Sequence, residues 1–245
     1  MSTLLFYSDP VPLDKKKHAS LKFKTSDTLA FASGVNSVPI AGSEIFAASR
    51  HFPVLFYKNS SGNYLPIVLL SLRKDGNDLG TDWNGFYVPA FVRRYPFALT
   101  DEGMVVIDTK APHFQADDGE NLFTDGEASD TLKKIVQFLE VVQATYKGTE
   151  EFCKALVEKQ LLTPFNTKLN FKNATIEIGE MYAIDEKKLH QLDDADVPNW
   201  FKKGWIAWAY AHLHSISALN DLAKRHAQAS HSSAATAGAD NSAKH

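Results

Sequence analysis

Two adjacent arginines, Arg93 and Arg94, lie in the aromatic-rich stretch from Trp83 to Phe97. A guanidinium group presents a planar fork of donors that suits bidentate capture of a carboxylate, from the protein itself or from an anionic ligand. If the stretch is a strand, the two arginines point to opposite faces, so they cannot perform the same task. We therefore expect one arginine to stabilise the fold, with Glu44 as a candidate internal partner, and look for function at the other.

The candidate binding residues of this stretch are aromatic or cationic. They are Trp83, Tyr87, Phe91, Arg93, Arg94 and Tyr95. Aromatic and arginine side chains carry much of the binding energy of protein interfaces, so a protein or peptide partner is the first expectation.

Weaker candidates lie elsewhere in the chain. They are Glu44, Arg50, His51, His113, Trp205 and Trp208. They leave open a second class of function, an enzyme or a small-ligand-binding domain. In that class one arginine holds a carboxylate, and His18, His51 or His113 acts as an acid, a base or a metal ligand.

The motifs of several common enzyme classes are absent. The sequence has no Gly-x-Gly-x-x-Gly, no phosphate loop ending in Gly-Lys-Ser/Thr, no Gly-x-Ser-x-Gly and no His-Glu-x-x-His. His212 and His214 are about 200° apart around a helix, so they cannot both face one metal ion. The acidic loop 117–127 lacks calcium-ligand spacing, because Phe123 and Leu132 fall at two ligand positions. We therefore expect no metal, no cofactor and no assigned catalytic residue.

Composition and charge exclude further classes of function. A net charge of −3 gives no positive field to attract nucleic acid or an anionic membrane. The single cysteine, Cys153, excludes an intramolecular disulfide. The sequence shows no secretory signal and no membrane span, so a cytoplasmic location is expected. Five lysines within 15–24 and nine acidic residues within 101–130 are expected to be solvated rather than paired.

Hydrophobic runs in the first half of the chain predict strands. The first two runs, 54–58 and 64–72, flank a five-residue polar connection typical of a hairpin. Two more runs follow, at 86–99 and 104–108. The connections are too short for crossover helices, so we expect one four-stranded antiparallel meander. Pro66 indicates that the second run begins at a sheet edge or at a bulge.

The second half is mainly helical. Apolar residues at helical spacing predict two successive helices, the first capped by Ser129, and one long helix over 199–225. In the long helix Phe201, Trp205 and Trp208 share one face, which predicts packing against the sheet, with a ligand or partner groove as the alternative.

These elements predict an α+β fold in which a mainly antiparallel β-sheet from the N-terminal half packs against C-terminal helices. One further strand is expected at 175–179. Residues 1–226 are expected to form a single domain. Residues 227–245 hold no aromatic or branched aliphatic side chain, so we expect a disordered Ala/Ser-rich tail.

Several short motifs match a known family. They are Val38-Pro39-Ile40, Phe52-Pro53-Val54, Gly119-Glu120-Asn121-Leu122-Phe123 and, above all, Tyr87-Val88-Pro89-Ala90-Phe91-Val92-Arg93-Arg94-Tyr95-Pro96-Phe97. From about Val11 to Arg225 the chain resembles the SapC family, which takes its name from a bacterial surface-layer secretion locus. The resemblance implies an accessory or binding protein of a bacterial surface-layer or outer-membrane export, uptake or protein-modification system. It implies no catalytic residues, so only the motif positions are carried over.

Overall fold

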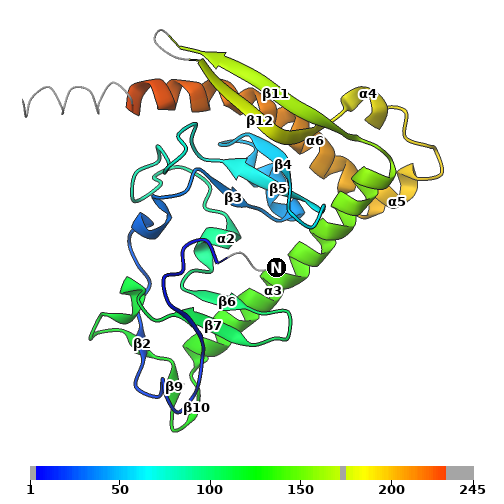
Figure 1. Ribbon diagram of the computed structural model, residues 1–245. Coiled ribbons are helices and arrows are strands. Elements are labelled where there is room, and N and C mark those ends of the chain that lie inside the picture. The colour runs from blue at the N-terminus through cyan, green and yellow to red at the C-terminus, as the bar shows by residue number, and fades with distance from the viewer. Residues whose placement is uncertain (1–3, 172–174, 230–245) are drawn as a thin grey trace, which may run out of the picture.

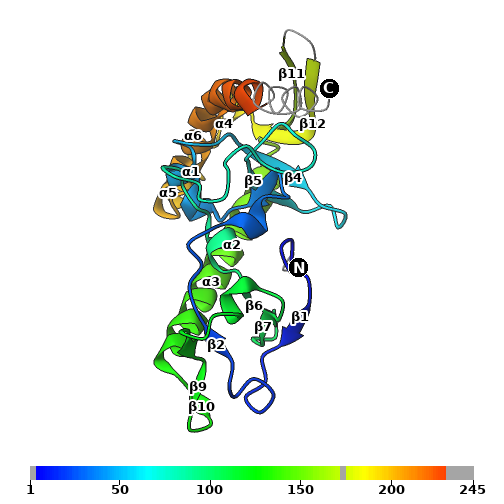
Figure 2. The same ribbon diagram turned by 90° about the vertical axis from the view of Figure 1, so that its left-hand side faces the viewer.

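The computed structural model describes residues 4–171 and 175–229 of the chain. Two antiparallel sheets and one long helix, α3 (Asp130–Glu158), form its framework. The sheets lie towards opposite ends of the molecule, and α3 passes beside both (Figure 1, Figure 2). The predicted α+β class is confirmed, with antiparallel strands mostly in the N-terminal half and helices in the C-terminal part.

The larger sheet has five strands in the order β11-β12-β4-β5-β3. They are β3 (Ser37–Pro39), β4 (Val54–Lys58), β5 (Tyr64–Leu69), β11 (Leu162–Asn170) and β12 (Thr175–Ile184). The predicted hairpin is confirmed, because β4 and β5 pair across the connection 59–63. The strand expected at 175–179 is longer and forms a second hairpin with β11, which joins the sheet where Tyr182 pairs with Phe56.

The smaller sheet has three strands in the order β1-β7-β6. They are β1 (Pro10–Pro12), β6 (Phe97–Leu99) and β7 (Val105–Asp108). Two short ribbons accompany them, β2 (Lys22–Phe23) with β8 (Glu120–Asn121) and β9 (Phe123–Thr124) with β10 (Glu127–Ala128). The single four-stranded meander is therefore wrong, because the chain between β5 and β6 carries the two hairpins into different sheets.

The strand expected over 86–99 is largely a loop and a helical turn. Residues Ala90–Arg93 form α2, and the amide of Arg94 donates to the carbonyl of Ala90 at the end of that turn. Pro89 explains the difference, since its fixed φ and missing N–H suit a helix start. Only the last residues of the run enter β6.

The expectation that the strand holding Pro66 begins at a sheet edge is confirmed locally. Strand β5 is flanked by β4 and β3, but β3 pairs only with residues 67–69, so β5 begins without a strand partner on that side. The ladder between β3 and β5 ends at the pair Pro39–Ile67, and the carbonyl of Pro66 accepts from the amide of Ile40 at 3.0 Å. Pro66 thus lies just past the end of β3, where its missing N–H removes no ladder hydrogen bond.

The two helices expected after Ser129 are one continuous helix, α3. The Ser129 hydroxyl accepts from the amide of Leu132 at 3.2 Å, which confirms the predicted N-cap. Gly148 lies inside the helix without ending it. Packing of α3 against both ends of the molecule outweighs the cost of about 1 kcal/mol that an interior glycine carries.

The long C-terminal helix is broken at Gly204, whose φ of +74° a glycine adopts without strain. Before it lies α5 (Val197–Lys202); after it come α6 (Trp205–Ser215), the 3₁₀ turn η4 (Ile216–Ala218) and helical residues 219–229. The break turns Phe201 outward, 74% exposed, and Trp200 is buried instead. The shared face predicted for Phe201 is therefore wrong.

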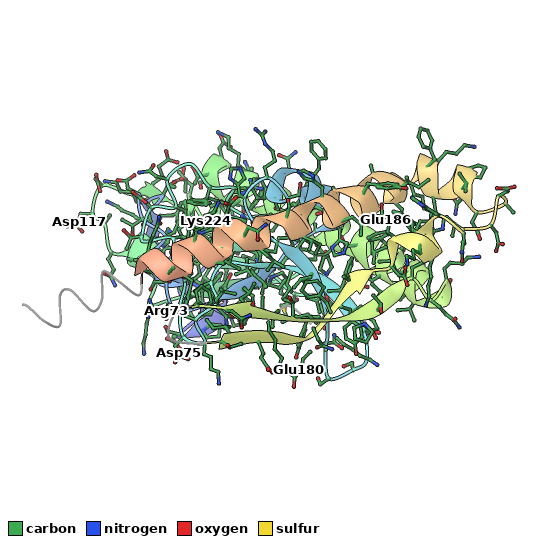
Figure 3. The ribbon with its side chains drawn as sticks, turned by 90° about the horizontal axis from the view of Figure 1, so that it is seen from above. Arg73, Asp75, Asp117, Glu180, Glu186 and Lys224 are labelled. Carbon is green, nitrogen blue, oxygen red and sulfur yellow. The ribbon has the colours of Figure 1, made fainter. Side chains whose placement is uncertain are left out.

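Short helices complete the fold. They are η1 (Ala30–Ala32), η2 (Gly42–Glu44), α1 (Ile45–Ala48), η3 (Pro112–Phe114) and α4 (Glu186–Leu189). Seen from above, the C-terminal helical segment runs along the β11–β12 hairpin (Figure 3). No helix in the described ranges combines the length and apolarity needed to span a membrane. Of the predicted tail, residues 230–245 lie outside the described residues and 227–229 end the last helix.

Helix α3 contributes to two separate hydrophobic cores. Its C-terminal half packs Phe152 against Trp205, with ring centroids 5.9 Å apart, in the core beneath the larger sheet. Its N-terminal half places Leu132 and Leu139 against Phe97 of the smaller sheet. Because one rigid helix serves both cores, it fixes the spacing of the two sheets.

The basic and acidic segments are partly paired, contrary to expectation. Antiparallel pairing of β2 with β8 brings Lys24 to 2.6 Å from Asp118, and Lys22 donates to the carbonyl of Asp117 at 2.7 Å. The three lysines at 15–17 are exposed, as expected.

Candidate functional site

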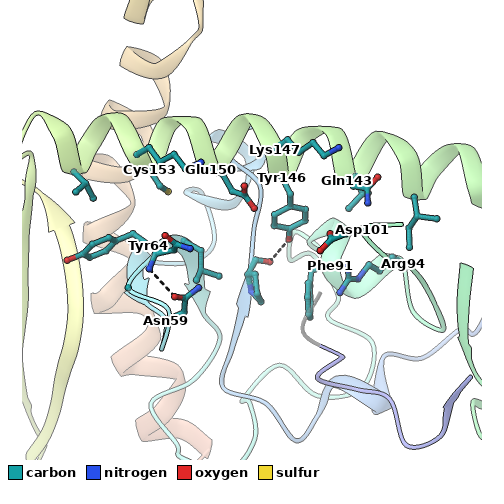
Figure 4. Close-up of a pocket in the computed structure, with 18 of the residues that line it drawn as sticks. Asn59, Tyr64, Phe91, Arg94, Asp101, Gln143, Tyr146, Lys147, Glu150 and Cys153 are labelled. Carbon is teal, nitrogen blue, oxygen red and sulfur yellow. Dashed lines mark hydrogen bonds between the residues drawn. The ribbon is translucent and has the colours of Figure 1, made fainter. Parts of the chain in front are cut away.

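A cleft of about 620 Å³ runs along α3 between the two sheets (Figure 4). We call it the α3 cleft. Its first wall is α3 itself, from Leu139 to Glu158. Its second wall combines Pro39 of β3, the turn between β4 and β5, α2, and the end of β6 with Asp101. The site is therefore assembled from segments far apart in the sequence.

The α3 wall is a single helical stripe. Its residues recur three or four positions apart: Leu139, Val142, Gln143, Tyr146, Lys147, Glu150, Cys153, Lys154, Val157 and Glu158. At 1.5 Å per residue the stripe is about 28 Å long. Leu139, Val142 and Cys153 are buried and give it an apolar floor. The charged members are exposed and form a rim.

The charged rim has alternating signs. Along α3 the order is Lys147, Glu150, Lys154 and Glu158. Neighbouring members are three or four residues apart, a spacing at which opposite charges on a helix can pair. Within the described ranges, however, none of the four forms an ion pair within 4.0 Å. Each charge is therefore directed to solvent rather than to a protein partner.

The turn between β4 and β5 is a well-defined part of the second wall. The Asn59 side-chain oxygen accepts from the amides of Ser61 and Asn63, each at 3.0 Å. Gly62 has φ +83°, a conformation that favours glycine. These features fix the shape of the turn. Tyr64, labelled in Figure 4, and Leu65 follow it and also line the cleft.

Arg94 and Phe91 line the cleft together. The guanidinium carbon of Arg94 lies 4.3 Å from the Phe91 ring centroid, and the side chain is largely buried. This is a cation–π arrangement. Across from them the Tyr146 hydroxyl donates to the carbonyl of Pro39 at 3.3 Å. Burial raises the pKa of Tyr146, the negative charge of Glu44 raises it further and Arg94 opposes the rise, so the phenol stays neutral.

Arg93 has a different environment, outside the cleft. Its Nε donates to the carbonyl of Val88 at 3.0 Å, and its Nη2 lies 3.9 Å from Glu44 Oε1. Its guanidinium also lies over the ring of Phe138, at 5.4 Å. The two arginines diverge as predicted, but because successive residues of a helical turn are about 100° apart, not because the segment is a strand.

Glu44 is the internal carboxylate that this region is built on. It is buried, and Oε1 accepts from the Tyr87 hydroxyl and from the amide of Ala90, both at 2.7 Å. Its other oxygen accepts from the amide of Ala41 at 3.0 Å. Burial and the hydrogen bond to Glu44 raise the pKa of Tyr87 to about 12. The carboxylate thus ties η2 to the start of α2.

The other residues of the aromatic stretch belong to the core. Trp83 is 1% exposed and packs on Phe52. Tyr95 is buried, and its hydroxyl donates to Asp108 Oδ2 at 2.9 Å. Tyr87 is half-buried on Glu44. Of the six residues first singled out, only Phe91 and Arg94 line the α3 cleft.

The histidine candidates are not brought to the cleft. His51 lies beside Phe86, and burial, followed by the charges of Arg50 and Arg225, lowers its pKa. His113 is buried and stacked on Phe23, and burial lowers its pKa to about 4.

The remaining weaker candidates are also not part of the cleft lining. Trp205 and Trp208 pack on Phe152 in the main core, and Arg50 is exposed at the end of the α1 region. His18 accepts from the amide of Asp14 through Nδ1, at 2.9 Å. In the described residues no cluster of three or more His, Cys, Asp or Glu could hold a metal ion.

The sequence does not lead to the residues of α3 that line the cleft. The helical spacing of Tyr146, Glu150, Cys153 and Val157 is a usable signal. It is weak because a stripe of mixed charge is the usual pattern of a solvated helix face. Dividing α3 at Gly148 further hides the length of the stripe.

A model of the SapC family matches residues 13–222. The chain belongs to the SapC family. The matched range includes α2, both arginines and all the α3 residues of the cleft, and it confirms the resemblance seen in the sequence motifs. No curated protein and no solved structure gives a significant match to this SapC chain.

Proposed function

We propose that this SapC protein is a binding protein that holds an extended segment of a peptide or protein partner in the α3 cleft. The observation that carries the proposal is the α3 stripe from Leu139 to Glu158, with its apolar floor and exposed charged rim. An extended chain rises about 3.3 Å per residue, so the 28 Å stripe matches about eight or nine residues.

The shape of the cleft favours an elongated occupant over a compact one. A volume of about 620 Å³ would also suit a small ligand, but here it is spread along five turns of helix. The lining offers accessible apolar surface at Leu65, Leu99 and Val157, above the largely buried floor residues. Burial of such a surface, with polar groups setting orientation, is the usual basis of peptide recognition.

Arg94 supplies positive charge within the second wall. Because it is largely buried against Phe91, its field is screened less than that of a surface lysine. We assign to Arg94 the attraction of a carboxylate of the bound segment, either a side chain or a chain terminus. Arg93, bound to Val88 and Glu44, is assigned a structural role.

The family suggests the setting. Its link to a bacterial surface-layer locus supports an accessory role in a surface-layer or outer-membrane export, uptake or protein-modification system. In that setting the segment bound in the α3 cleft belongs to a client protein, and binding takes place in the cytoplasm. This setting is part of the proposal.

A photo-crosslinking amino acid at Val157 tests the proposal in the organism that encodes the chain. Val157 is 45% exposed and lines the cleft, whereas Val141, 57% exposed on the same helix, does not and serves as the matched control. We expect adducts at Val157 that map to one contiguous stretch of a partner, and none at Val141. Equal labelling at both valines, or adducts scattered over many unrelated sequences, contradicts the proposal. Absence of adducts, with a rise in melting temperature on adding succinate or citrate, favours a small carboxylate ligand.

A further inference from the structure

The charges of the α3 cleft restrict what kind of segment it can hold. The rim alternates Lys147, Glu150, Lys154 and Glu158 on α3, and the second wall adds one charge of each sign, Arg94 and Asp101. The lining is therefore balanced, with three positive and three negative groups. A balanced lining has no net field to collect an occupant of a single sign.

The four rim charges are available to pair with a bound segment, because they do not pair with one another. All four side chains are exposed, and in the described part of the chain none is within 4.0 Å of an opposite charge. An incoming charged group therefore meets each one without having to break an existing pair.

The spacing of the rim matches an extended chain. At 1.5 Å per residue, Glu150, Lys154 and Glu158 follow one another at intervals of about 6 Å along the helix axis, and Lys147 precedes Glu150 by about 4.5 Å. In an extended strand the side chains of one face repeat every two residues, about 6.6 Å apart. Over four charges the accumulated mismatch is about 3 Å, which long charged side chains can absorb.

We propose that the occupant is an extended, mixed-charge peptide segment whose acidic and basic side chains alternate at every second residue. Its acidic groups oppose Lys147 and Lys154, and its basic groups oppose Glu150 and Glu158. The inference rests on the proposed function and specifies its ligand. A uniformly acidic or basic chain meets repulsion at every other rim position, so the cleft discriminates against it.

Four capped nine-residue peptides test this inference on the purified full chain. They share the same five intervening residues and differ at the four even-numbered positions, which are Glu-Lys-Glu-Lys, all Glu, all Lys or all Gln. Titration with fluorescein-labelled peptides at low ionic strength gives the dissociation constants. Each exposed ion pair contributes only weakly, but four pairs act together, so we expect the alternating peptide to bind about tenfold more tightly than the other three.

A charge variant makes the test specific to the rim. Lys147→Glu combined with Lys154→Glu makes the rim uniformly acidic, and it should transfer the preference from the alternating peptide to the all-Lys peptide. The control is Lys134→Glu with Lys202→Glu, two exposed lysines outside the cleft with the same change in net charge. We expect the control to keep the preference of the unaltered protein.

Equal binding of all four peptides overturns the inference, and so does binding of none up to about 1 mM. An unchanged preference in the Lys147 and Lys154 variant overturns it as well. None of these results decides the proposed function, because cross-linking at Val157 reports on any bound segment whatever its charges. The two proposals can therefore fail separately.

Discussion

The guanidinium of Arg94 lies over the ring of Phe91, 4.3 Å from its centroid, within one wall of the α3 cleft. The neighbouring Arg93 is held instead by the carbonyl of Val88 and the carboxylate of Glu44. The two adjacent cations are thereby separated in environment, one within the cleft lining and one bound to Val88 and Glu44 outside it.

This separation predicts different outcomes for two substitutions. Arg93→Ala should lower the free energy of unfolding by about 0.5–1 kcal/mol, because its pair with Glu44 is partly exposed, and should leave cross-linking at Val157 unchanged. Arg94→Met keeps an apolar contact with Phe91 but removes the charge, so cross-linking at Val157 should fall severalfold.

Urea denaturation of both variants is the necessary control, because Arg94 is largely buried. A third variant, Arg94→Lys, retains the charge without the planar stack and should recover part of the cross-linking. Loss of cross-linking in Arg93→Ala, with Arg94→Met behaving like the unaltered chain, would reverse the assignment.

Local patterns in the sequence predict local structure here, and little more. The β4–β5 hairpin follows from two hydrophobic runs and the turn around Gly62, and the Ser129 cap from its position before a helical pattern. The helical turn α2 is missed because Phe91 and Val92 are strand-type residues, although Pro89 starts a helix. Local propensity alone does not decide such a segment.

The cleft is beyond such prediction because it depends on contacts between distant segments. Its walls come from residue 39 and from residues 59–65, 91–101 and 139–158, and no periodicity shows that these four segments lie together. Burial of Trp83 and Tyr95 also arises only from tertiary packing. Of the four aromatic candidates in the stretch, Trp83, Phe91 and Tyr95 are buried in the core, and Phe91 also lines the α3 cleft.

A second prediction concerns the buried carboxylate of Glu44. It accepts hydrogen bonds from the Tyr87 hydroxyl and from the amides of Ala90 and Ala41. Glu44→Ala leaves these donors without their acceptor in a buried site, so we expect a loss of about 2–4 kcal/mol in the free energy of unfolding. Glu44→Gln keeps one oxygen acceptor and should lose less. Chemical denaturation with intrinsic tryptophan fluorescence measures both, and equal stability of Glu44→Ala and the unaltered chain would contradict this role.

A third prediction concerns acid stability. Burial lowers the pKa of His113 and of His212 from 6.5 to about 4, so both are neutral in the folded protein at pH 6. The unfolded chain binds these protons at higher pH than the folded chain does. The contribution of these two histidines to stability is therefore fully present above pH 6.5. It decreases as the pH falls from 6.5 to about 4, by up to about 1.4 kcal/mol per pH unit for each histidine.

His113→Phe isolates one of these contributions. His113 stacks on Phe23 among aromatic neighbours, so phenylalanine fits its surroundings without a titrating group. The variant should lose less stability between pH 6.5 and 4 than the unaltered chain, measured by urea denaturation at half-unit steps. Identical pH slopes for the two proteins would show that His113 does not carry the effect.

A fourth prediction uses Cys153, which lies in the floor of the cleft but is almost fully buried. Burial, followed by the negative charge of Glu150, raises the pKa of its thiol to about 12. Because the thiolate is the reactive form, iodoacetamide at pH 8 should modify the native protein far more slowly than the protein in urea. Intact-mass spectrometry over time measures both rates directly, since the chain has one cysteine. Once Cys153 is alkylated, the added group occupies the apolar floor and should abolish cross-linking at Val157. Similar alkylation rates in the folded and the unfolded chain would contradict the burial of the thiol.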